Sequence, residues 1–350
     1  MSVRRSRVAV AAALFTLLAL LPIAAAPVLA KDHAVSEHNR ILSYWTKERI
    51  ANATTRDYVR QADGKFKMVK TKPTQGKPPK PPGGGGGGTT VLGASWTAGG
   101  PVLRITGKVV FTMNSGDYIC TGTVVNDSKT DRSIVVSAGH CAYDAADGGF
   151  ARNWMFIPEF DSAPTYTCSA SKWGCWTAKG LAVHRGFAES GGFNTQATTY
   201  DWSFAFLSTG GKVNALLDNT ATSVGSLPIS FNAPAVGSQT FNFGYPAAGK
   251  YHGSDLIYCA DQVFLDPQNQ NLTLGIDCDM TGGSSGGPWF AGFANGSGTV
   301  DSVNSYGYGG VKKEYGPKFN TTNTQPTYNA ALNATIPATG TNNVLVGTAP

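Results

Sequence analysis

Beyond about Val91 the chain alternates short stretches of β-branched and aromatic residues with clusters of Gly, Asn, Asp and Pro. Such stretches, with turn signals between them, predict antiparallel strands of a sandwich or barrel, and runs of helical periodicity are scarce. The expected strands are residues 102–105, 108–113, 121–125, 133–136, 202–207, 239–243 and 256–258. A stretch of about 250 residues suits one all-β domain with two barrels and a single deep cleft between them.

The longest apolar run lies near the start of the chain and predicts export. It extends from Val8 to Leu21, follows three arginines, and is succeeded by small residues that end at Ala30. A transmembrane anchor is the alternative, but Pro22 and Pro27 break the run and its apolar core is short for a bilayer span. We therefore expect a signal peptide over residues 1–30, a secreted, extracellular protein, and no stable membrane insertion after the signal is removed.

The polar region that follows predicts a segment that is removed before the protein acts. Residues 31–71 are mixed in charge, with a short helix expected around Glu37 to Ile50. Residues 72–90 contain a Lys- and Pro-rich stretch and then six consecutive glycines, a composition that cannot bury a core. We expect a pro-segment over 31–71, a linker over 72–90 where it is cut away, and a domain over 91–350. A permanent tether is the alternative for the linker.

The net charge of +6 is unevenly distributed. Residues 1–80 contain 15 Lys and Arg against 5 Asp and Glu, whereas residues 81–350 contain 13 against 17. The predicted domain is therefore mildly acidic, and a nucleic-acid partner has no electrostatic support.

Six cysteines lie beyond residue 100, and in an exported protein an even number predicts disulfides. Six cysteines allow fifteen connectivities, of which the simplest joins neighbours along the chain. That pairing is Cys120 with Cys141, Cys168 with Cys175, and Cys259 with Cys278. A zinc site is the alternative, but no Cys-x2-Cys spacing occurs, so we expect no metal.

Hydrolysis of an amide by a serine requires a base, and His140 has the most suggestive context for that role. His33 and His38 precede the linker, and His184 and His252 lie in contexts typical of structural or surface histidines. His140 instead follows the apolar strand Val135 to Ser137 and directly precedes Cys141. A disulfide from Cys141 back to Cys120 would hold this loop against the neighbouring strand.

A carboxylate is needed to orient that base, and Asp201 stands at the head of the nearly all-apolar stretch Trp202 to Leu207. Burying an acid there is costly unless a partner satisfies it, and His140 would be such a partner. A turn aspartate that caps the preceding loop is the alternative.

Glycines surround the candidate nucleophile, Ser285, in the run Gly282 to Pro288. Glycine permits positive φ and close approach of a substrate, so the N–H groups of Gly283 and Ser285 could form an oxyanion hole. A plain Gly/Ser turn is the structural alternative. The run also matches the nucleophile elbow of α/β-hydrolases, but in that fold the serine precedes the acid and the histidine. Here Ser285 comes last, and a strand rather than a helix follows it.

The order His140, Asp201, Ser285 resembles that of the chymotrypsin-like serine peptidases. Ordered motifs carry this resemblance over roughly residues 95–310: Cys120 to Val125, Ser137 to Cys141, Asp201 to Phe204, Gly283 to Pro288, and Ser305-Tyr306-Gly307. The run that contains Ser285 is most similar to the bacterial branch that includes the V8-like glutamyl endopeptidases. The resemblance implies two six-stranded antiparallel β-barrels with the active site in the cleft between them. It also implies that Ser305, Tyr306 and Gly307 line that cleft and bind substrate.

Departures from the family affect activation and specificity. Ser284 replaces the aspartate that receives the new N-terminal amine when animal trypsins are activated, so any pro-segment must inhibit in another way. Asn304 stands where the glutamyl-specific branch has histidine. Asp279 lies six residues before Ser285, the spacing at which trypsins place the acid that selects Arg or Lys at P1. Structural support of the loop beside Cys278 is the alternative role for Asp279.

These observations together predict a secreted, monomeric serine endopeptidase that acts on polypeptides without a cofactor, with a preference for Arg or Lys at P1 as the expectation from Asp279. A catalytically silent relative that serves as a secreted binding or adhesion module is the alternative. Inactive relatives usually lose a triad residue, whereas this chain keeps all three in context.

Overall fold

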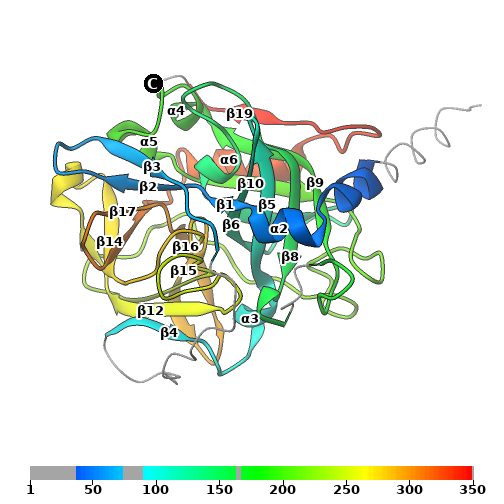
Figure 1. Cartoon of the computed structure of the whole chain (residues 1–350), viewed down its shortest axis with the longest axis horizontal. Helices are drawn as coiled ribbons and strands as arrows, with labels where there is room; N and C mark the ends of the chain where they lie inside the picture. The colour runs from blue at the N-terminus through cyan, green and yellow to red at the C-terminus, as the bar shows by residue number, and fades with distance from the viewer. Residues whose placement is uncertain (1–36, 74–89, 163–166, 349–350) are drawn as a thin grey trace, which may run out of the picture.

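The computed structural model describes residues 37–73, 90–162 and 167–348, and every contact below concerns these residues. Strands dominate and helices are short, so the fold class is the expected all-β, two-barrel one (Figure 1). The leader expected over residues 1–30 and most of the linker lie outside the described residues.

The first half of the domain closes into a six-stranded antiparallel barrel. Its strands pair in the order β6-β5-β8-β9-β10-β7, and β7 returns to β6. The strands are β5 (Thr106–Met113), β6 (Gly116–Val125), β7 (Ser133–Ser137), β8 (Arg152–Pro158), β9 (Trp176–His184) and β10 (Ser203–Leu207). Four of them, β5, β7, β9 and β10, are buried along their whole length, and in β7 and β10 this burial appears in the sequence as a nearly continuous apolar run.

The second half consists of two sheets that pack together. Their strand orders are β16-β15-β11-β12-β4 and β13-β14-β18-β17-β2-β3. A disulfide from Cys259, in β12, to Cys278, just after β14, joins the two sheets. The strands of this half are β4 (Val91–Ser95), β11 (Gln239–Gly244), β12 (Ile257–Gln262), β13 (Phe264–Leu265), β14 (Thr273–Asp277), β15 (Pro288–Ala294), β16 (Ser297–Val303), β17 (Tyr306–Tyr308) and β18 (Lys313–Pro317).

The segment before the linker is folded onto both halves (Figure 1). Residues 37–44 are helical, and a break at Trp45 and Thr46 separates them from the next helix. Ile41, Trp45 and Ile50 belong to the main hydrophobic core. The other elements of the segment are α2 (Lys47–Asn52), β1 (Thr54–Thr55), β2 (Asp57–Arg60) and β3 (Phe66–Val69). Strand β1 joins β6 and strand β2 joins β17, both in parallel, so one short segment extends a sheet of each half.

The C-terminal residues, which sequence patterns place poorly, are part of the fold. β18 pairs with β14 and β17, α6 (Thr324–Asn333) packs on β9 and β10, and β19 (Val344–Val346) pairs in parallel with β9. The remaining helices are short: α3 (Pro101–Ile105), η1 (Gly139–Cys141), η2 (Phe160–Ser162), α4 (Arg185–Ala188), α5 (Thr195–Thr199) and η3 (Pro267–Asn269).

All six cysteines form disulfides, in the neighbour pairing Cys120–Cys141, Cys168–Cys175 and Cys259–Cys278. Within the described ranges, no helix is long and apolar enough to span a bilayer.

Candidate active site

His140 lies in η1, the single turn that follows the buried strand β7. The Cys120–Cys141 disulfide attaches this turn to β6, and Ser203 Oγ donates 2.8 Å to the carbonyl of Ala138. Covalent and hydrogen-bonded restraints therefore fix the backbone on both sides of the imidazole, which is fully buried in this structure.

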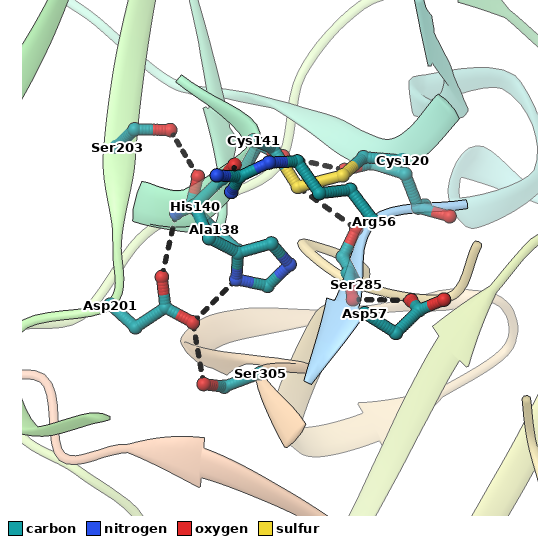
Figure 2. Close-up of polar contacts among 12 residues, drawn as sticks. Arg56, Asp57, Cys120, Ala138, His140, Cys141, Asp201, Ser203, Ser285 and Ser305 are labelled. Atoms are coloured by element: carbon teal, nitrogen blue, oxygen red, sulfur yellow. Dashed lines mark hydrogen bonds and ion pairs between the residues drawn. A yellow bond between two sulfur atoms is a disulfide. The ribbon is translucent and has the colours of Figure 1, made fainter. Parts of the chain in front are cut away.

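Asp201, immediately before β10, receives three hydrogen bonds (Figure 2). Its Oδ2 lies 2.8 Å from His140 Nδ1 and accepts 2.6 Å from Ser305 Oγ, while its Oδ1 accepts 2.8 Å from the backbone N–H of His140. The carboxyl group is fully buried, so these bonds replace its hydration. This arrangement can hold the imidazole with a proton on Nδ1 and leave Nε2 as the base.

Ser285 lies in the turn between β14 and β15. Gly283 (φ +98°) and Gly286 (φ +82°) flank it in the left-handed region that glycine adopts without cost. A Cβ at Gly286 would lie 2.1 Å from Ser137 Oγ, so only glycine fits there. Thr121 N–H donates 2.8 Å to the Ser285 carbonyl and Gly286 N–H donates 2.8 Å to the Asn304 carbonyl. The turn is therefore attached to both halves of the domain.

Asp57, from β2, occupies the space in front of Ser285 (Figure 2). Its Oδ1 accepts 3.0 Å from Ser285 Oγ and 3.0 Å from the backbone N–H of Gly283. Asp57 Oδ2 and His140 Nε2 are both buried and have no hydrogen-bond partner among the described residues. The Ser285 hydroxyl is thus directed to Asp57, and the base nitrogen of His140 is unused.

The residues next to Asp57 also contact the His140 loop. Arg56 is buried, donates 2.7 Å to the His140 carbonyl, and forms a 3.1 Å ion pair with Asp144. Burial opposes ionisation of Asp144, but Arg56 and backbone N–H donors outweigh it and lower the pKa of that carboxyl. The Tyr58 ring meets the His140 ring edge-on, with centroids 5.4 Å apart, and stacks on Phe193.

A cavity of about 280 Å³ lies beside Ser285. Its lining includes Ser284, the predicted substrate-binding residues Ser305, Tyr306 and Gly307, and Glu314. The Glu314 side chain is buried, and its carboxyl has one long hydrogen bond, 3.4 Å from Ser284 Oγ. Burial, and secondarily the Asp57 carboxyl, raise the pKa of Glu314 well above its usual range.

Asp279 lies outside the lining of this cavity. Its carboxyl accepts 2.7 Å from Lys250 Nζ and 2.5 Å from the Tyr251 hydroxyl. A Cβ at Gly93, in β4, would lie 2.2 Å from Asp279 Oδ1, so the acid is in close contact with that strand.

One group of potential metal ligands occurs in the described part of the chain: Cys120, His140 and Cys141. Because the two cysteines form a disulfide, they offer no thiolate to a metal.

The structure thus brings together His140, Asp201, Ser285, Gly283 and the cleft strand Ser305–Gly307, and it places Asp279 apart from them. Sequence reasoning missed Arg56, Asp57 and Glu314. The signal for the first two was weak: Ile41, Trp45 and Ile50 are large apolar residues in an otherwise polar segment, which indicates that the segment docks on a partner surface.

Two solved structures show extensive similarity to this chain. The protease Anisep from Arthrobacter nicotinovorans is 38% identical with a TM-score of 0.56, over 65% of this chain and 95% of that one. The thermostable serine protease AL20 from an extremophilic microorganism is 34% identical with a TM-score of 0.56, over 67% of this chain and all of that one. Comparison with protein-family models and with curated proteins gives no match.

Proposed function

The chain belongs to the chymotrypsin-like serine peptidases, and from this premise we propose that it is a secreted endopeptidase whose catalytic triad is Ser285, His140 and Asp201. The observation that carries the proposal is the buried Asp201 carboxyl, which orients His140 through Nδ1 at 2.8 Å beside a serine in a glycine-rich turn. The three residues come from distant parts of the sequence, and a structural role alone would not require that grouping.

In the proposed reaction His140 Nε2 accepts the Ser285 hydroxyl proton as Oγ attacks the carbonyl carbon of the scissile peptide. The carbonyl π electrons move to oxygen, and the N–H groups of Gly283 and Ser285 stabilise that oxyanion. The C–N bond then breaks, the leaving amine takes the proton from His140, and the acyl group stays on Ser285. Water then attacks the acyl carbon while His140 takes one of its protons, the ester bond to Ser285 Oγ breaks, and Ser285 Oγ receives that proton as the carboxylic acid leaves. Asp201 stabilises the imidazolium in both the acylation and the deacylation step.

The cleft strand would hold the substrate. Backbone groups of Ser305 to Gly307 are proposed to pair with the residues that precede the scissile bond, as an added strand. The P1 side chain would then enter the cavity beside Ser285. No cofactor takes part in this mechanism.

A basic P1 residue is the proposed preference, and two acids could select it. Asp279 has the spacing to Ser285 that the family uses, but its carboxyl is already paired with Lys250. Glu314 lines the cavity, and Ser284 is its one hydrogen-bond partner among the described side chains, so a Lys or Arg side chain would supply the missing cation. Comparing Glu314→Gln with Asp279→Asn on Arg, Lys and Ala substrates identifies the acid. Equal turnover of all three substrates by the unaltered chain would exclude the preference.

Export and processing complete the proposal. Residues 1–30 would direct secretion, residues 31–71 would be a pro-segment, and cleavage within the linker would release a monomeric enzyme. The six paired cysteines and the similarity to bacterial proteases support an extracellular location.

Active-site labelling tests this function. A fluorophosphonate should modify the processed chain, and Ser285→Ala should abolish labelling and peptidase activity together. Ser284→Ala is the matched control because it removes the neighbouring hydroxyl, and it should still be labelled. If Ser285→Ala retained full activity the mechanism would be wrong, and a chain that is never labelled would favour the silent binding module.

A further inference from the structure

The cleft of this chain already contains a ligand, which is its own N-terminal segment. Strand β2 lies along β17, the strand proposed to pair with substrate, in the register Tyr58 with Tyr306, Val59 with Gly307, and Arg60 with Tyr308 (Figure 1). Strand β3 then pairs with β2 and completes the edge of that sheet. The substrate-binding edge is therefore occupied by backbone from residues 57–60.

The polarity of this strand is opposite to that of a substrate. In the proposed mechanism the residues along β17 precede the scissile bond, so a productive chain leads away from Ser285 in its N-terminal direction. Here Asp57 lies at Ser285, and the residues that lead away along β17, Tyr58 to Arg60, follow it in the sequence. The segment therefore pairs with β17 in parallel, whereas a substrate would run the other way.

A carboxyl group takes the place of the scissile carbonyl. Asp57 Oδ1 accepts from the Gly283 N–H that would hold the oxyanion and from the Ser285 hydroxyl that would attack. A carboxyl group is a poor acyl donor, because attack on it would have to expel hydroxide or oxide rather than an amine. The Asp57 carboxyl therefore binds beside the nucleophile without offering it a peptide bond that the enzyme can cut.

Contacts on both sides of Asp57 hold it in this position. Arg56 is bound to the His140 carbonyl and to Asp144, and β1 joins the first barrel. Tyr58 packs against the His140 ring. These contacts bring the segment onto the catalytic groups themselves rather than onto a remote surface.

We propose that residues 53–71 are a built-in inhibitor that binds the cleft in reverse polarity and presents the Asp57 carboxyl to Ser285 and the oxyanion hole. This inference rests on the proposed function. It assigns the segment a function of its own, which is to inhibit the peptidase by binding its substrate cleft. It also explains how the chain can be kept inactive with Ser284 beside the nucleophile, where no activating ion pair can form.

The full chain tests the proposal through the rate at which a fluorophosphonate labels Ser285. The unaltered chain should be labelled slowly, and Asp57→Ala should be labelled at least about tenfold faster, because two hydrogen bonds to a buried carboxyl are lost. Asp63→Ala is the matched control: it removes an acid from the turn between β2 and β3, away from Ser285, and its rate should stay within about twofold of the unaltered chain.

Intact mass measurement during long incubation supplies the second readout. The reversed strand predicts that the bonds of residues 56–60 stay uncut even in chain that has become active. Rapid labelling of the unaltered full chain, or cleavage within residues 56–60, would overturn the inference and leave the proposed function standing. Absence of labelling in every variant, including chain whose linker has been cut, would instead remove the proposed function and the inference with it.

Discussion

Asp201 Oδ2 is shared by two donors, His140 Nδ1 and Ser305 Oγ, and its Oδ1 holds the His140 backbone. In Asp201→Asn one oxygen becomes an N–H2 donor, so His140 is driven towards the tautomer that carries its proton on Nε2. That tautomer cannot accept the Ser285 proton, and we expect kcat on a peptide substrate to fall by roughly 10⁴-fold. Asp131→Asn, an exposed acid paired with its neighbour Arg132, is the control and should change little. Activity of Asp201→Asn within tenfold of the unaltered enzyme would contradict the assignment.

Asp301, in β16, gives a second prediction at the residue scale, and it concerns stability. Both carboxyl oxygens are buried without a hydrogen-bond partner in the described part of the chain, and burial raises the pKa of Asp301 to about 8. The folded state therefore binds a proton that the unfolded state releases above its ordinary pKa of about 4. The protonated carboxyl therefore makes its full contribution to the free energy of unfolding below pH 4, and this contribution is lost as the pH rises towards 8.

Asp301→Asn removes that titration. We expect its Tm to exceed that of the unaltered chain by several degrees at pH 8.5 and to match it at pH 4.5, as measured by calorimetry. Asp261→Asn, on the more exposed end of β12, should show no such pH-dependent gain. An equal effect of Asp301→Asn at both pH values would show that the carboxyl does not titrate in the folded state as expected.

The triad candidates could be predicted because each has an informative local context. His140 follows an apolar strand and precedes a cysteine, and Ser285 lies among glycines. Asp57 has no such context, since the hydrogen bond that defines its position spans 228 residues of sequence. Glu314 was missed for a related reason: its neighbours in sequence belong to an ordinary strand, and only the fold places it beside Ser284.

Among the elements, the barrel strands were the most predictable. Strands β5, β7 and β10 coincide closely with apolar stretches, because burial on both faces leaves continuous hydrophobic runs, and β6 does so over its second half, residues 121–125. The stretch 102–105, expected as a strand, belongs instead to the helix α3. The short helix expected around Glu37 to Ile50 is present as residues 37–44 and α2. The N-terminal strands were not predictable, since β2 and β3 carry polar and charged residues that exist as strands only through pairing with β17 and with each other. Local propensity for such edge strands depends on context and gives little signal.

The C-terminal elements lead to a prediction on truncation. α6 covers β9 and β10, and it buries Tyr328 and Ala331, whereas β19 has three half-buried residues on the edge of β9. Ending the chain after Pro337 should therefore lower the unfolding free energy by about 2–4 kcal/mol, a fall in Tm of roughly 5–10 °C. Ending it after Lys318 should prevent folding. Thermal unfolding and yield of soluble protein are the measurements, and a stable, active chain that ends at Lys318 would show that α6 is dispensable.

At the scale of the whole molecule, one short segment links the two halves at the point where they form the active site. Strand β1 extends the first barrel, strand β2 extends a sheet of the second half, and Asp57 lies between these two contacts at Ser285. Removing the segment would therefore expose the nucleophile, the oxyanion site and the cleft strand together. Because the segment covers all three together, any condition that weakens its docking should expose them at the same time and so raise peptidase activity.

The pH dependence of docking follows from the charges that meet in the cleft. Glu314 and His140 face Asp57 from the domain, while the neighbouring Arg56 is engaged by Asp144. Burial raises the pKa of Asp57, and burial followed by the Asp57 carboxyl raises the pKa of Glu314. Between the ordinary and the raised pKa values, the carboxyls of Asp57 and Glu314 are consequently protonated while the segment is docked and release their protons once it has left.

Linkage fixes the direction of the effect. Docking is strongest below the ordinary carboxyl pKa values near 4 and weakens as the pH rises towards the raised values, by up to about tenfold per pH unit for each proton held. We therefore expect the full chain to be labelled by the fluorophosphonate progressively faster between pH 5 and pH 9, relative to chain whose linker has been cut and whose segment has been removed. That ratio removes the pH effects on the labelling chemistry that both forms share.

The variant Glu314→Gln distinguishes the contribution of the Glu314 carboxyl from that of Asp57. The variant keeps the shape of the pocket and removes one ionisable group, so the ratio of labelling rates should depend less steeply on pH while docking at pH 8 becomes tighter. Asp279→Asn, whose acid lies outside the cavity, is the matched control and should leave the slope unchanged. A ratio that falls with pH, or one that is equally steep in Glu314→Gln, would mean that protons on this carboxyl pair do not govern the release of the segment.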